Sequence, residues 1–421
     1  MNIWFFHHYS TPDHLSGLHR PYEFGISLQK SGHSVTVFAA SFLHYSGVNL
    51  IEDKTPYIVR TDKEVPYVYV RTPGYKNSGK DRMINMYLFY HRLFAVSKAY
   101  AKQNGKPDVI IASSPHPLTM IAGLRIAKKF KIPCICEIRD FWPEVFFCSG
   151  KLKESSIIGK CLLKGEKWIY KKADALVFLK EGDITYITDH HWDRQSGGSI
   201  DLSKCFYINN GVDFRAFTEK INAEKFDDPD LLSDAFKVVY CGSIRPVNQV
   251  DTFVAAANFL KDENILILIY GDGSCINDIQ AQITKDNLAN VKLKGYVQNK
   301  YIPYILSRSS VNVLHYSAAD YNWSRGNSSN KLFEYMASGR PIISTVKMGY
   351  SLLEKYRCGI TSDSNTPESI AEAIKKIKDM SEAEYSALCD NAKKAAQDFD
   401  FEVLTAKLTD VIGFVSDKHN K

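Results

Sequence analysis

Short apolar runs alternate with amphipathic stretches along the first half of the chain, which is the order of elements in βαβ units. The runs at 2–6 and 108–113 contain few polar residues, as strands covered on both faces of a parallel sheet should. Further strands are predicted at 33–38, 133–138, 175–178 and 205–208, and helices at 18–30 and 119–129. This half is therefore predicted to be a doubly wound α/β domain.

The same pattern restarts after a polar linker between residues 209 and 237. Strands are predicted at 237–241, 265–270, 291–294, 311–314 and 341–344, a helix at 250–260, and further helices to the C-terminus. The fold class is therefore α/β, with two Rossmann-like doubly wound domains and C-terminal helices. We expect an N-terminal domain at 1–208, a second domain at 209–395, and a last segment, 396–421, that packs back on the first domain.

Composition places the chain among ordinary globular proteins, with 45% hydrophobic and 24% charged residues. No apolar stretch is long enough for a transmembrane helix, and the apolar start is too short for a signal peptide. The nine cysteines are scattered without Cys-x-x-Cys spacing, which favours reduced thiols in a cytoplasmic protein. Four histidines between residues 7 and 19 are irregularly spaced, so no metal site is predicted.

The positive charge is concentrated in the first 190 residues, which hold 26 Lys and Arg against 17 Asp and Glu. Such an excess favours an anionic partner, namely nucleic acid, phosphorylated lipid or a membrane surface, unless it is a chance drift of surface charge. No nucleic-acid-binding module accompanies it, so nucleic acid is not expected.

Glycines follow two predicted strands of the second half. Gly242 precedes Ser243-Ile244-Arg245, and Gly271-Asp272-Gly273 follows the strand at 265–270. A glycine at a strand end permits a tight turn and lets backbone N–H groups approach a phosphate, and Arg245 would supply a forked cation. Ordinary α/β turns also use such glycines, so these motifs alone leave both interpretations open.

The segment 326–341 is the strongest candidate site. A polar loop runs into a predicted helix that carries Lys331 and Glu334 in its first turns and ends at Gly339. The helix N-terminus and Lys331 would meet a diphosphate, and Glu334, three residues on, would accept hydrogen bonds from ribose hydroxyls. The alternative is a solvated surface ion pair.

This segment, NKLFEYMASGRPII, resembles the donor-binding segment of the family 4 retaining glycosyltransferases, especially the branch that builds O-antigen and capsule polysaccharides. Residues 17–38 and 107–144 resemble the same branch in order, as do 173–175, 208–213 and 269–273. The resemblance implies a GT-B fold, in which two Rossmann-like domains face a cleft. It also implies transfer with retention, no required metal or other cofactor, a nucleotide in the C-terminal domain and an acceptor mainly in the N-terminal domain.

Carried over by position, Glu334 matches the ribose-holding glutamate, and Asn330 and Lys331 match the helix start near the diphosphate. Arg245 matches a diphosphate-contacting arginine of some relatives, and Gly17 a backbone approach to the reacting sugar. The implied donor-binding residues are Gly17, Gly242, Arg245, Gly271, Asp272, Gly273, Val297, Asn330, Lys331, Leu332 and Glu334. The expected catalytic residues are Asp140, Arg245, Lys331 and Glu334, and a UDP-linked N-acetylated or deoxy sugar is the favoured donor.

Two positions depart from the family pattern. Gly326 stands where many members carry a second glutamate that contacts the sugar, and Asn248 stands where many carry a lysine near the leaving diphosphate. The departures weaken any inference about sugar identity, and they leave the leaving group to Arg245, Lys331 and backbone N–H groups.

In the N-terminal half, the loop after the strand at 133–138 carries Arg139 and Asp140, and the loop after 108–113 carries His116. All three are expected to contact the acceptor or the transferred sugar, with Asp140 in the place of a family histidine. Alternatively, Arg139 forms a structural ion pair with Asp140 or Glu144, and His116 is structural.

Two basic, aromatic-rich stretches, 82–102 and 151–172, have the pattern of amphipathic helices. The expected partners are thus a nucleotide-sugar donor, a glycan or polyprenyl-diphosphate-linked acceptor and, peripherally, the anionic inner face of the cell membrane. In the alternative, their apolar faces belong to the core.

The predicted function is transfer of a sugar from a nucleotide sugar to a glycan or lipid-linked acceptor in cell-surface polysaccharide biosynthesis. Two alternatives remain open, a nucleotide-sugar epimerase or phosphorylase of the same fold, and a non-catalytic assembly subunit. A dinucleotide dehydrogenase is not expected, because no G-x-G-x-x-G follows the first strand.

Overall fold

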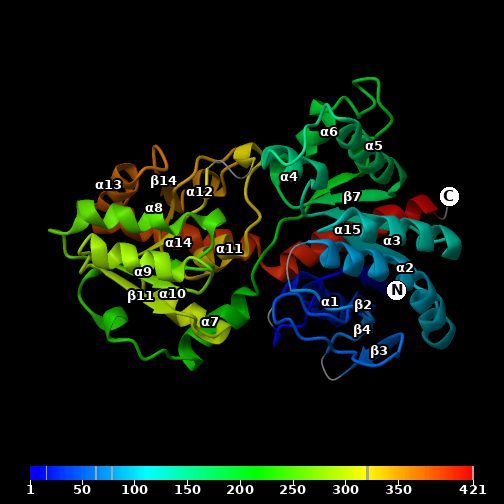
Figure 1. Cartoon of the computed structure of the whole chain (residues 1–421), viewed down its shortest axis with the longest axis horizontal. Coiled ribbons are helices and arrows are strands. Elements are labelled where there is room, and N and C mark those ends of the chain that lie inside the picture. Colours follow the sequence, from blue (N-terminus) through cyan, green and yellow to red (C-terminus); the bar gives the residue numbers. More distant parts are fainter. Residues whose placement is uncertain (16, 62–63, 77–78, 319–321, 420–421) are drawn as a thin grey trace. The chain divides into compact units, whose positions relative to one another are not determined.

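The computed structural model of the chain describes residues 1–15, 17–61, 64–76, 79–318 and 322–419. It divides into two units, the first comprising Met1–Asn209 and Leu404–Lys421 and the second Asn210–Val403 (Figure 1). The expected division at 395/396 falls inside α14 (Glu382–Asp398), which packs on α11 (Asn330–Ala337) and so stays with the second unit.

The first unit contains an eight-stranded sheet in the order β3-β4-β2-β1-β5-β6-β7-β8. All neighbours are parallel except the antiparallel pair β3–β4. The strands are β1 (Asn2–Phe6), β2 (Ser34–Ala40), β3 (Tyr57–Arg60), β4 (Tyr67–Val70), β5 (Val109–Ser113), β6 (Cys134–Ile138), β7 (Ala175–Phe178) and β8 (Cys205–Tyr207). The six strands predicted in this half are confirmed, whereas β3 and β4 were not predicted.

Helices cover this sheet on both faces, as a doubly wound fold requires (Figure 1). They are α1 (Arg20–Lys30), α2 (Lys80–Asn104), α3 (Pro117–Phe130), α4 (Trp142–Cys148), α5 (Ile157–Lys172), α6 (Thr185–Asp189) and the greater part of α15 (Phe401–His419). Alternate strand residues such as Trp4 and Phe6 pack with Phe89 and Leu93 of α2. In α15, Phe414 packs on Phe206 with ring centroids 5.3 Å apart.

The second unit contains a six-stranded parallel sheet in the order β11-β10-β9-β12-β13-β14. The strand order reverses between β9 and β12, the place where open α/β sheets bind ligands beyond the strand ends. The strands are β9 (Phe236–Cys241), β10 (Ile265–Tyr270), β11 (Val291–Gly295), β12 (Val311–Leu314), β13 (Ile342–Ser344) and β14 (Gly359–Thr361). The first five were predicted, and β14 was not.

Helices α8, α9 and α13 share a core with alternate residues of this sheet. Helix α7 contacts both α10 and α11, and α11 contacts α14. The bounds are α7 (Phe214–Ala223), α8 (Val250–Ala255), α9 (Ile276–Lys285), α10 (Ile302–Arg308), α12 (Leu352–Tyr356) and α13 (Pro367–Lys378). Thr366 caps α13 by accepting from the Ser369 N–H, and Ser381 and Glu384 form a capping box at the start of α14.

Candidate functional site

The loops that follow β9 and β10 pack directly on each other in the second unit. Gly271 has a φ of 151°, and a Cβ there would lie 1.8 Å from the carbonyl oxygen of Gly242. A Cβ on Gly273 would lie 2.2 Å from the Ile244 carbonyl oxygen. Glycine is therefore needed at both positions for loop packing alone, so these two glycines do not by themselves indicate a phosphate site.

Helix α11 begins beside these loops with its N-terminal N–H groups uncapped by a side chain. The residue before it, Ser329, uses its hydroxyl to accept a hydrogen bond from Tyr316 at 2.5 Å instead of capping the helix. Asn210 supports the preceding loop, because its Nδ2 donates to the Ser328 carbonyl at 2.6 Å. A helix end with free N–H groups and a positive dipole favours an anion.

Lys331 lies between two aromatic rings in the first turn of α11. Its Nζ is 4.6 Å from the centroid of the Tyr240 ring and 5.2 Å from that of Tyr316, and it donates to the Tyr240 hydroxyl at 3.2 Å. Burial lowers the pKa of Lys331 to about 8, against the opposing effects of Cys241 and Glu334. A Cβ on Gly242 would lie 2.5 Å from this Nζ, so that glycine makes room for the lysine.

Glu334 follows Lys331 by one helical turn, and its carboxylate has no hydrogen-bond partner within the described part of the chain. Burial raises the pKa of Glu334 to about 7, although Lys331 and Lys220 act to lower it. A half-buried carboxylate without a hydrogen-bond partner is costly unless a ligand supplies the donors. Lys331 and Glu334 are thus not the solvated surface pair of the alternative interpretation.

The remaining predicted donor residues lie around this helix end in varied environments. Arg245 and Asp272 are exposed at the ends of the β9 and β10 loops, and Val297 is half-buried in the loop after β11. Leu332 is buried and Asn330 is exposed at the start of α11. Their roles stay predictions.

The two departures from the family pattern have local structural explanations. Asn248 is buried, and its Oδ1 accepts a hydrogen bond from Ser243 Oγ at 2.9 Å, so it braces the loop after β9. Gly326 has a φ of 106°, a conformation that a glutamate would adopt only with strain. The local structure therefore suits both residues, Asn248 through its hydrogen bond to Ser243 and Gly326 through its positive φ.

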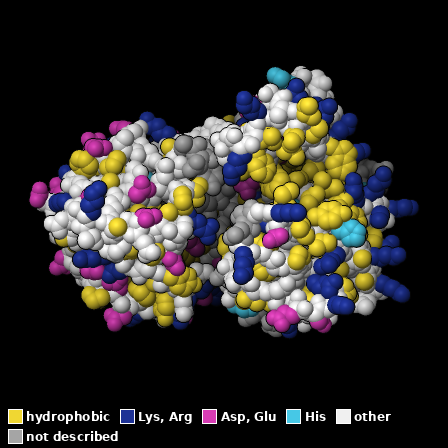
Figure 2. Space-filling model, in the orientation of Figure 1, with side chains coloured by type: hydrophobic (Ala, Val, Ile, Leu, Met, Phe, Trp, Pro, Cys, Tyr) yellow, Lys and Arg dark blue, Asp and Glu magenta, His cyan; other side chains and the backbone are white. Residues whose placement is uncertain are grey.

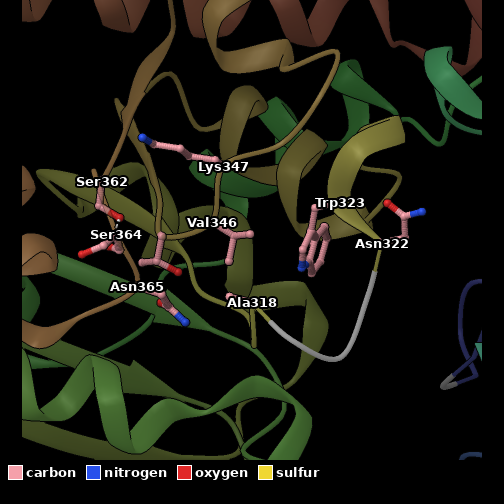
Figure 3. A pocket seen from close by; sticks show the side chains of 9 residues that line it. Ala318, Asn322, Trp323, Val346, Lys347, Ser362, Ser364 and Asn365 are labelled. Atoms are coloured by element: carbon pink, nitrogen blue, oxygen red, sulfur yellow. Dashed lines mark hydrogen bonds between the residues drawn. The ribbon is translucent and has the colours of Figure 1, made fainter. Parts of the chain in front are cut away.

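A pocket of about 380 Å³ lies at the carboxyl ends of β12, β13 and β14 (Figure 3). The sequence did not indicate it. Trp323 packs on Tyr316 with centroids 5.0 Å apart, and Asn365 Nδ2 donates to the Tyr316 carbonyl, so this pocket borders the ring that flanks Lys331. It is lined by Ala318, Asn322, Trp323, Thr345, Val346, Lys347, Ser362, Ser364 and Asn365.

In the first unit, the carboxyl ends of β1, β5 and β6 meet at one edge of the sheet. Glu137 of β6 is buried there and accepts from Arg20 Nε at 2.7 Å and from Ser113 Oγ at 2.6 Å. Burial raises the pKa of Glu137, but Arg20 and Arg139 outweigh it and hold the pKa below its ordinary value. Arg20 Nη2 also donates to the Ile208 carbonyl, so this pair fastens α1, β6 and the end of β8 together.

Arg139 lies closest to Glu137, with Nη1 3.9 Å from Oε1, so the alternative ion pair with Asp140 or Glu144 is wrong. This Nη1 is buried without a hydrogen-bond partner. Asp140 is exposed, and the described residues offer it no hydrogen bond or ion pair. The exposed Asp140 carboxylate is therefore available to a substrate, whereas Arg139 faces the Glu137 carboxylate.

His116 ends a buried hydrogen-bond chain that fixes its protonation. Asn85 Nδ2 donates to the Pro73 carbonyl, so Oδ1 is the atom that accepts from His8 Nε2, at 2.7 Å. His8 Nδ1 then accepts from His116 Nε2 at 3.0 Å, which leaves His116 Nδ1 as a buried acceptor without a partner. Burial, with His7 and Arg82, lowers the pKa of His116 to about 3, so the ring is neutral at physiological pH.

The remaining predicted residue of this unit, Gly17, packs tightly against the loop. A Cβ there would lie 2.1 Å from Thr11 Oγ1, which explains the glycine without a ligand. Sequence reasoning missed His8 as a partner of His116, and Tyr240 and Tyr316 as partners of Lys331. Two consecutive histidines directly after a buried strand were the available signal for the first.

Two further observations bear on metals and membranes. Among the described residues, no three His, Cys, Asp or Glu side chains are grouped as metal ligands would be. No helix in that part of the chain combines the length and hydropathy needed to span a bilayer.

Comparison with known proteins agrees with this architecture. The model "Glycosyl transferase 4-like domain" matches residues 22–196, and "Glycosyl transferases group 1" matches residues 235–379. WbjE of Pseudomonas aeruginosa, described as a glycosyltransferase, is 21% identical over 72% of this chain and 74% of its own. TuaH of Bacillus subtilis, described as a teichuronic acid biosynthesis glycosyltransferase, is 23% identical over 51% of this chain. The match spans about half (53%) of the length of TuaH.

Solved structures of glycosyltransferases share the fold. Sucrose-phosphate synthase from Thermosynechococcus elongatus has a TM-score of 0.70 at 16% identity, with 98% of both chains covered. HepE from Anabaena, solved with UDP, has a TM-score of 0.67 at 14% identity, covering 98% of this chain and all of its own. WaaG, a glycosyltransferase involved in lipopolysaccharide biosynthesis, has a TM-score of 0.63 at 15% identity, covering 97% of this chain and 99% of its own. With two matched glycosyltransferase models along most of its length, the chain belongs to the glycosyltransferases of the GT-B fold.

Proposed function

We propose that this glycosyltransferase takes its sugar from a UDP-sugar held at the start of α11. The observation that carries the proposal is the pair of Lys331 and the unpartnered Glu334 beside uncapped helix N–H groups. The cation and the helix end suit a diphosphate, and the carboxylate suits two ribose hydroxyls. HepE was solved with UDP and with UDP-glucose, which supports a uridine nucleotide here.

The sugar is proposed to be an N-acetylated or deoxy hexose, transferred with retention to a glycan or polyprenyl-diphosphate-linked acceptor. Retention rests on the resemblance to family 4. A role in cell-surface polysaccharide biosynthesis is supported by relatives whose names refer to teichuronic acid and lipopolysaccharide biosynthesis. Asp140, Arg139 and His116 Nδ1 are proposed to bind sugar or acceptor hydroxyls, because each offers a polar atom that the described residues leave without a hydrogen bond.

We expect the leaving diphosphate to be neutralised by Lys331, Arg245 and the α11 N-terminus rather than by a metal ion. Preorganised donors of this kind supply the main stabilisation of a developing anion. No other cofactor is proposed.

A thermal-shift panel of nucleotides and nucleotide sugars tests the donor proposal, because a ligand that binds the folded state raises the melting temperature. UDP and one UDP-sugar are expected to stabilise the protein most. Incubation of that donor without acceptor then separates the alternatives: slow hydrolysis supports a transferase, conversion to another UDP-sugar an epimerase, and an unchanged donor a non-catalytic subunit. A panel in which no nucleotide raises the melting temperature would contradict the proposal.

We further propose that the first unit docks peripherally on an anionic membrane, through exposed apolar side chains of α2, α4 and α5. One face of α2 is in the core, yet Met83, Ile84 and Tyr87 of that helix are exposed. Ile157 and Ile158 at the start of α5 are 83% and 63% exposed. Figure 2 shows hydrophobic side chains gathered on one face of this unit, with Lys and Arg side chains around them.

The lysines around this apolar surface favour an anionic membrane as its partner. Helix α5 and the turn before it carry six exposed lysines, Lys151, Lys153, Lys160, Lys164, Lys171 and Lys172. Each lysine near an anionic bilayer contributes about 1 kcal/mol, and apolar side chains add to this as they enter the interface.

Replacing Ile157 and Ile158 by serine is expected to reduce flotation with phosphatidylglycerol-containing vesicles at least about tenfold, because each buried isoleucine contributes about 1.5–3 kcal/mol. Both side chains are exposed, so the melting temperature should stay unchanged. The exposed pair Val48 and Val59, changed to serine in the same unit, is the matched control. Equal flotation of both variants, or no preference for anionic over neutral vesicles at low salt, would contradict the surface.

A further inference from the structure

A second cavity lies at the opposite edge of the second sheet from Lys331 and Glu334. It has a volume of about 290 Å³ and opens where β9, β12 and β13 begin. These strands are parallel neighbours, so their amino ends meet at one edge while Gly242 and the loop to α11 leave from the other. With a rise of about 3.3 Å per residue, the six residues of β9 separate the two edges by roughly 15–20 Å.

A cation lies in or just before each of the three strands and lines this cavity. Lys237 is the second residue of β9, Arg308 ends α10 shortly before β12, and Arg340 precedes β13. None of the three forms an ion pair with a carboxylate in the described part of the chain. The cavity therefore carries a positive charge that the neighbouring side chains do not neutralise.

Neutral groups hold the cations in place. Lys237 Nζ donates to the Ser233 carbonyl at 2.7 Å, and Arg340 Nε donates to the Ser307 carbonyl at 2.8 Å. The Arg308 guanidinium lies 5.2 Å from the centroid of the Tyr304 ring. These contacts fix the positions of the three side chains but do not neutralise their positive charge.

The cations also act on one another. Burial lowers the pKa of Lys237, Arg340 and Arg308 lower it further, and Asp234 opposes them only in part. Like charges gathered in a cavity destabilise each other until an anion enters.

Hydroxyl groups complete the lining. Ser310 Oγ accepts from the Lys237 backbone N–H at 3.0 Å, and its own O–H has no acceptor among the described residues. A tetrahedral oxyanion suits this set, because the arginines offer forked N–H donors, the lysine a point charge and the serine a neutral donor. The volume lies near the lower end of small-molecule sites, which suits a phosphorylated metabolite of about one sugar unit.

We propose that this cavity, lined by Lys237, Arg308, Arg340 and Ser310, is a second anion site that binds a small phosphorylated metabolite. The site is separate from the donor site, and binding there does not depend on the transfer reaction. It gives the second unit a place where a phosphorylated compound binds without competing with the nucleotide sugar.

Titration with inorganic phosphate tests the site in the full chain, with UDP present at saturation so that the α11 site is filled. Phosphate is expected to raise the melting temperature beyond potassium chloride at matched ionic strength, and calorimetry should show one site. Glucose 6-phosphate should bind and glucose should not. The variant Arg308→Gln/Arg340→Gln should bind phosphate at least about tenfold more weakly, since it removes two charged donors to the anion.

The matched control is Lys285→Gln/Lys292→Gln, which removes two exposed lysines of the same unit and should bind phosphate like the wild type. Arg340 also holds a backbone carbonyl, so the single change Arg308→Gln at an exposed position keeps the test valid if the double variant unfolds. The site is wrong if chloride at equal ionic strength stabilises the protein as much as phosphate, or if both arginine variants bind phosphate like the control.

Discussion

Replacing Glu334 by alanine is expected to weaken UDP binding at least about tenfold while leaving the fold intact. The carboxylate lies half-buried in the first turns of α11 and has no hydrogen-bond partner in the described chain, so its loss breaks no internal contact. A hydrogen bond between a charged group and a hydroxyl contributes about 1.5–3 kcal/mol, and about 1.4 kcal/mol is tenfold in affinity. Calorimetric titration with UDP gives the affinity, and the melting temperature of the free protein gives the stability.

A glutamine at this position keeps one acceptor oxygen and should lose less affinity than alanine. The control is Glu372→Gln, an exposed position of α13 without a partner in the same unit. Burial holds the pKa of Glu334 at about 7, and removing a carboxyl group whose charged form is disfavoured should leave the melting temperature equal or slightly higher. A purely structural role for Glu334 predicts the reverse, namely unchanged UDP affinity with a lower melting temperature.

Much of the fold could be predicted because its strands are apolar runs set between amphipathic helices. Ile265–Tyr270 is buried on both faces and is recognisable from composition alone. Tyr57–Arg60 and Tyr67–Val70 were not predicted, because their place in the sheet depends on other strands: β3 pairs with β4, and β4 pairs with β2. Strand β14 is three residues long and half-buried, too short for any period to show.

The donor side of the candidate site was accessible from the sequence because Lys331 and Glu334 belong to one helix. Spacing along a helix fixes which side chains share a face, so three residues suffice to place the pair. The rings around Lys331 were not accessible, because Tyr240 and Tyr316 come from β9 and from the loop after β12. Within strand β9, Tyr240 was indistinguishable from an ordinary core residue.

In the first unit, contacts between residues far apart in the sequence made the site still harder to predict. His116 depends on His8, which is 108 residues away, and Glu137 depends on Arg20, 117 residues away. The alternative interpretation paired Arg139 with its near neighbours Asp140 or Glu144, but in the structure Arg139 lies beside Glu137 at the end of β6. Pairs that form only when separate strands are aligned carry no signal in the local sequence.

Replacing Lys331 by methionine is expected to reduce kcat by about 100- to 1000-fold, the usual cost of removing one preorganised group that stabilises a developing anion. The lysine is held between the rings of Tyr240 and Tyr316 at the uncapped end of α11, and Asn248 supplies no second cation nearby. Burial disfavours the charged form of Lys331, so the apolar replacement should not lower the melting temperature. Lys376→Met, at an exposed position of α13, is the control that should keep full activity.

The pH dependence of kcat/KM separates this role from simple packing, because it reports the ionisations of the free enzyme. Glu334 must lose its proton, so activity should rise with pH through about 7, and Lys331 must keep its proton, so activity should fall with pH above about 8. The profile is therefore a narrow bell. Lys331→Met should remove the fall on the alkaline side, and Glu334→Gln should remove the rise on the acid side. An alkaline fall that persists unchanged in Lys331→Met would assign that ionisation to another group and leave Lys331 without its proposed role at the diphosphate.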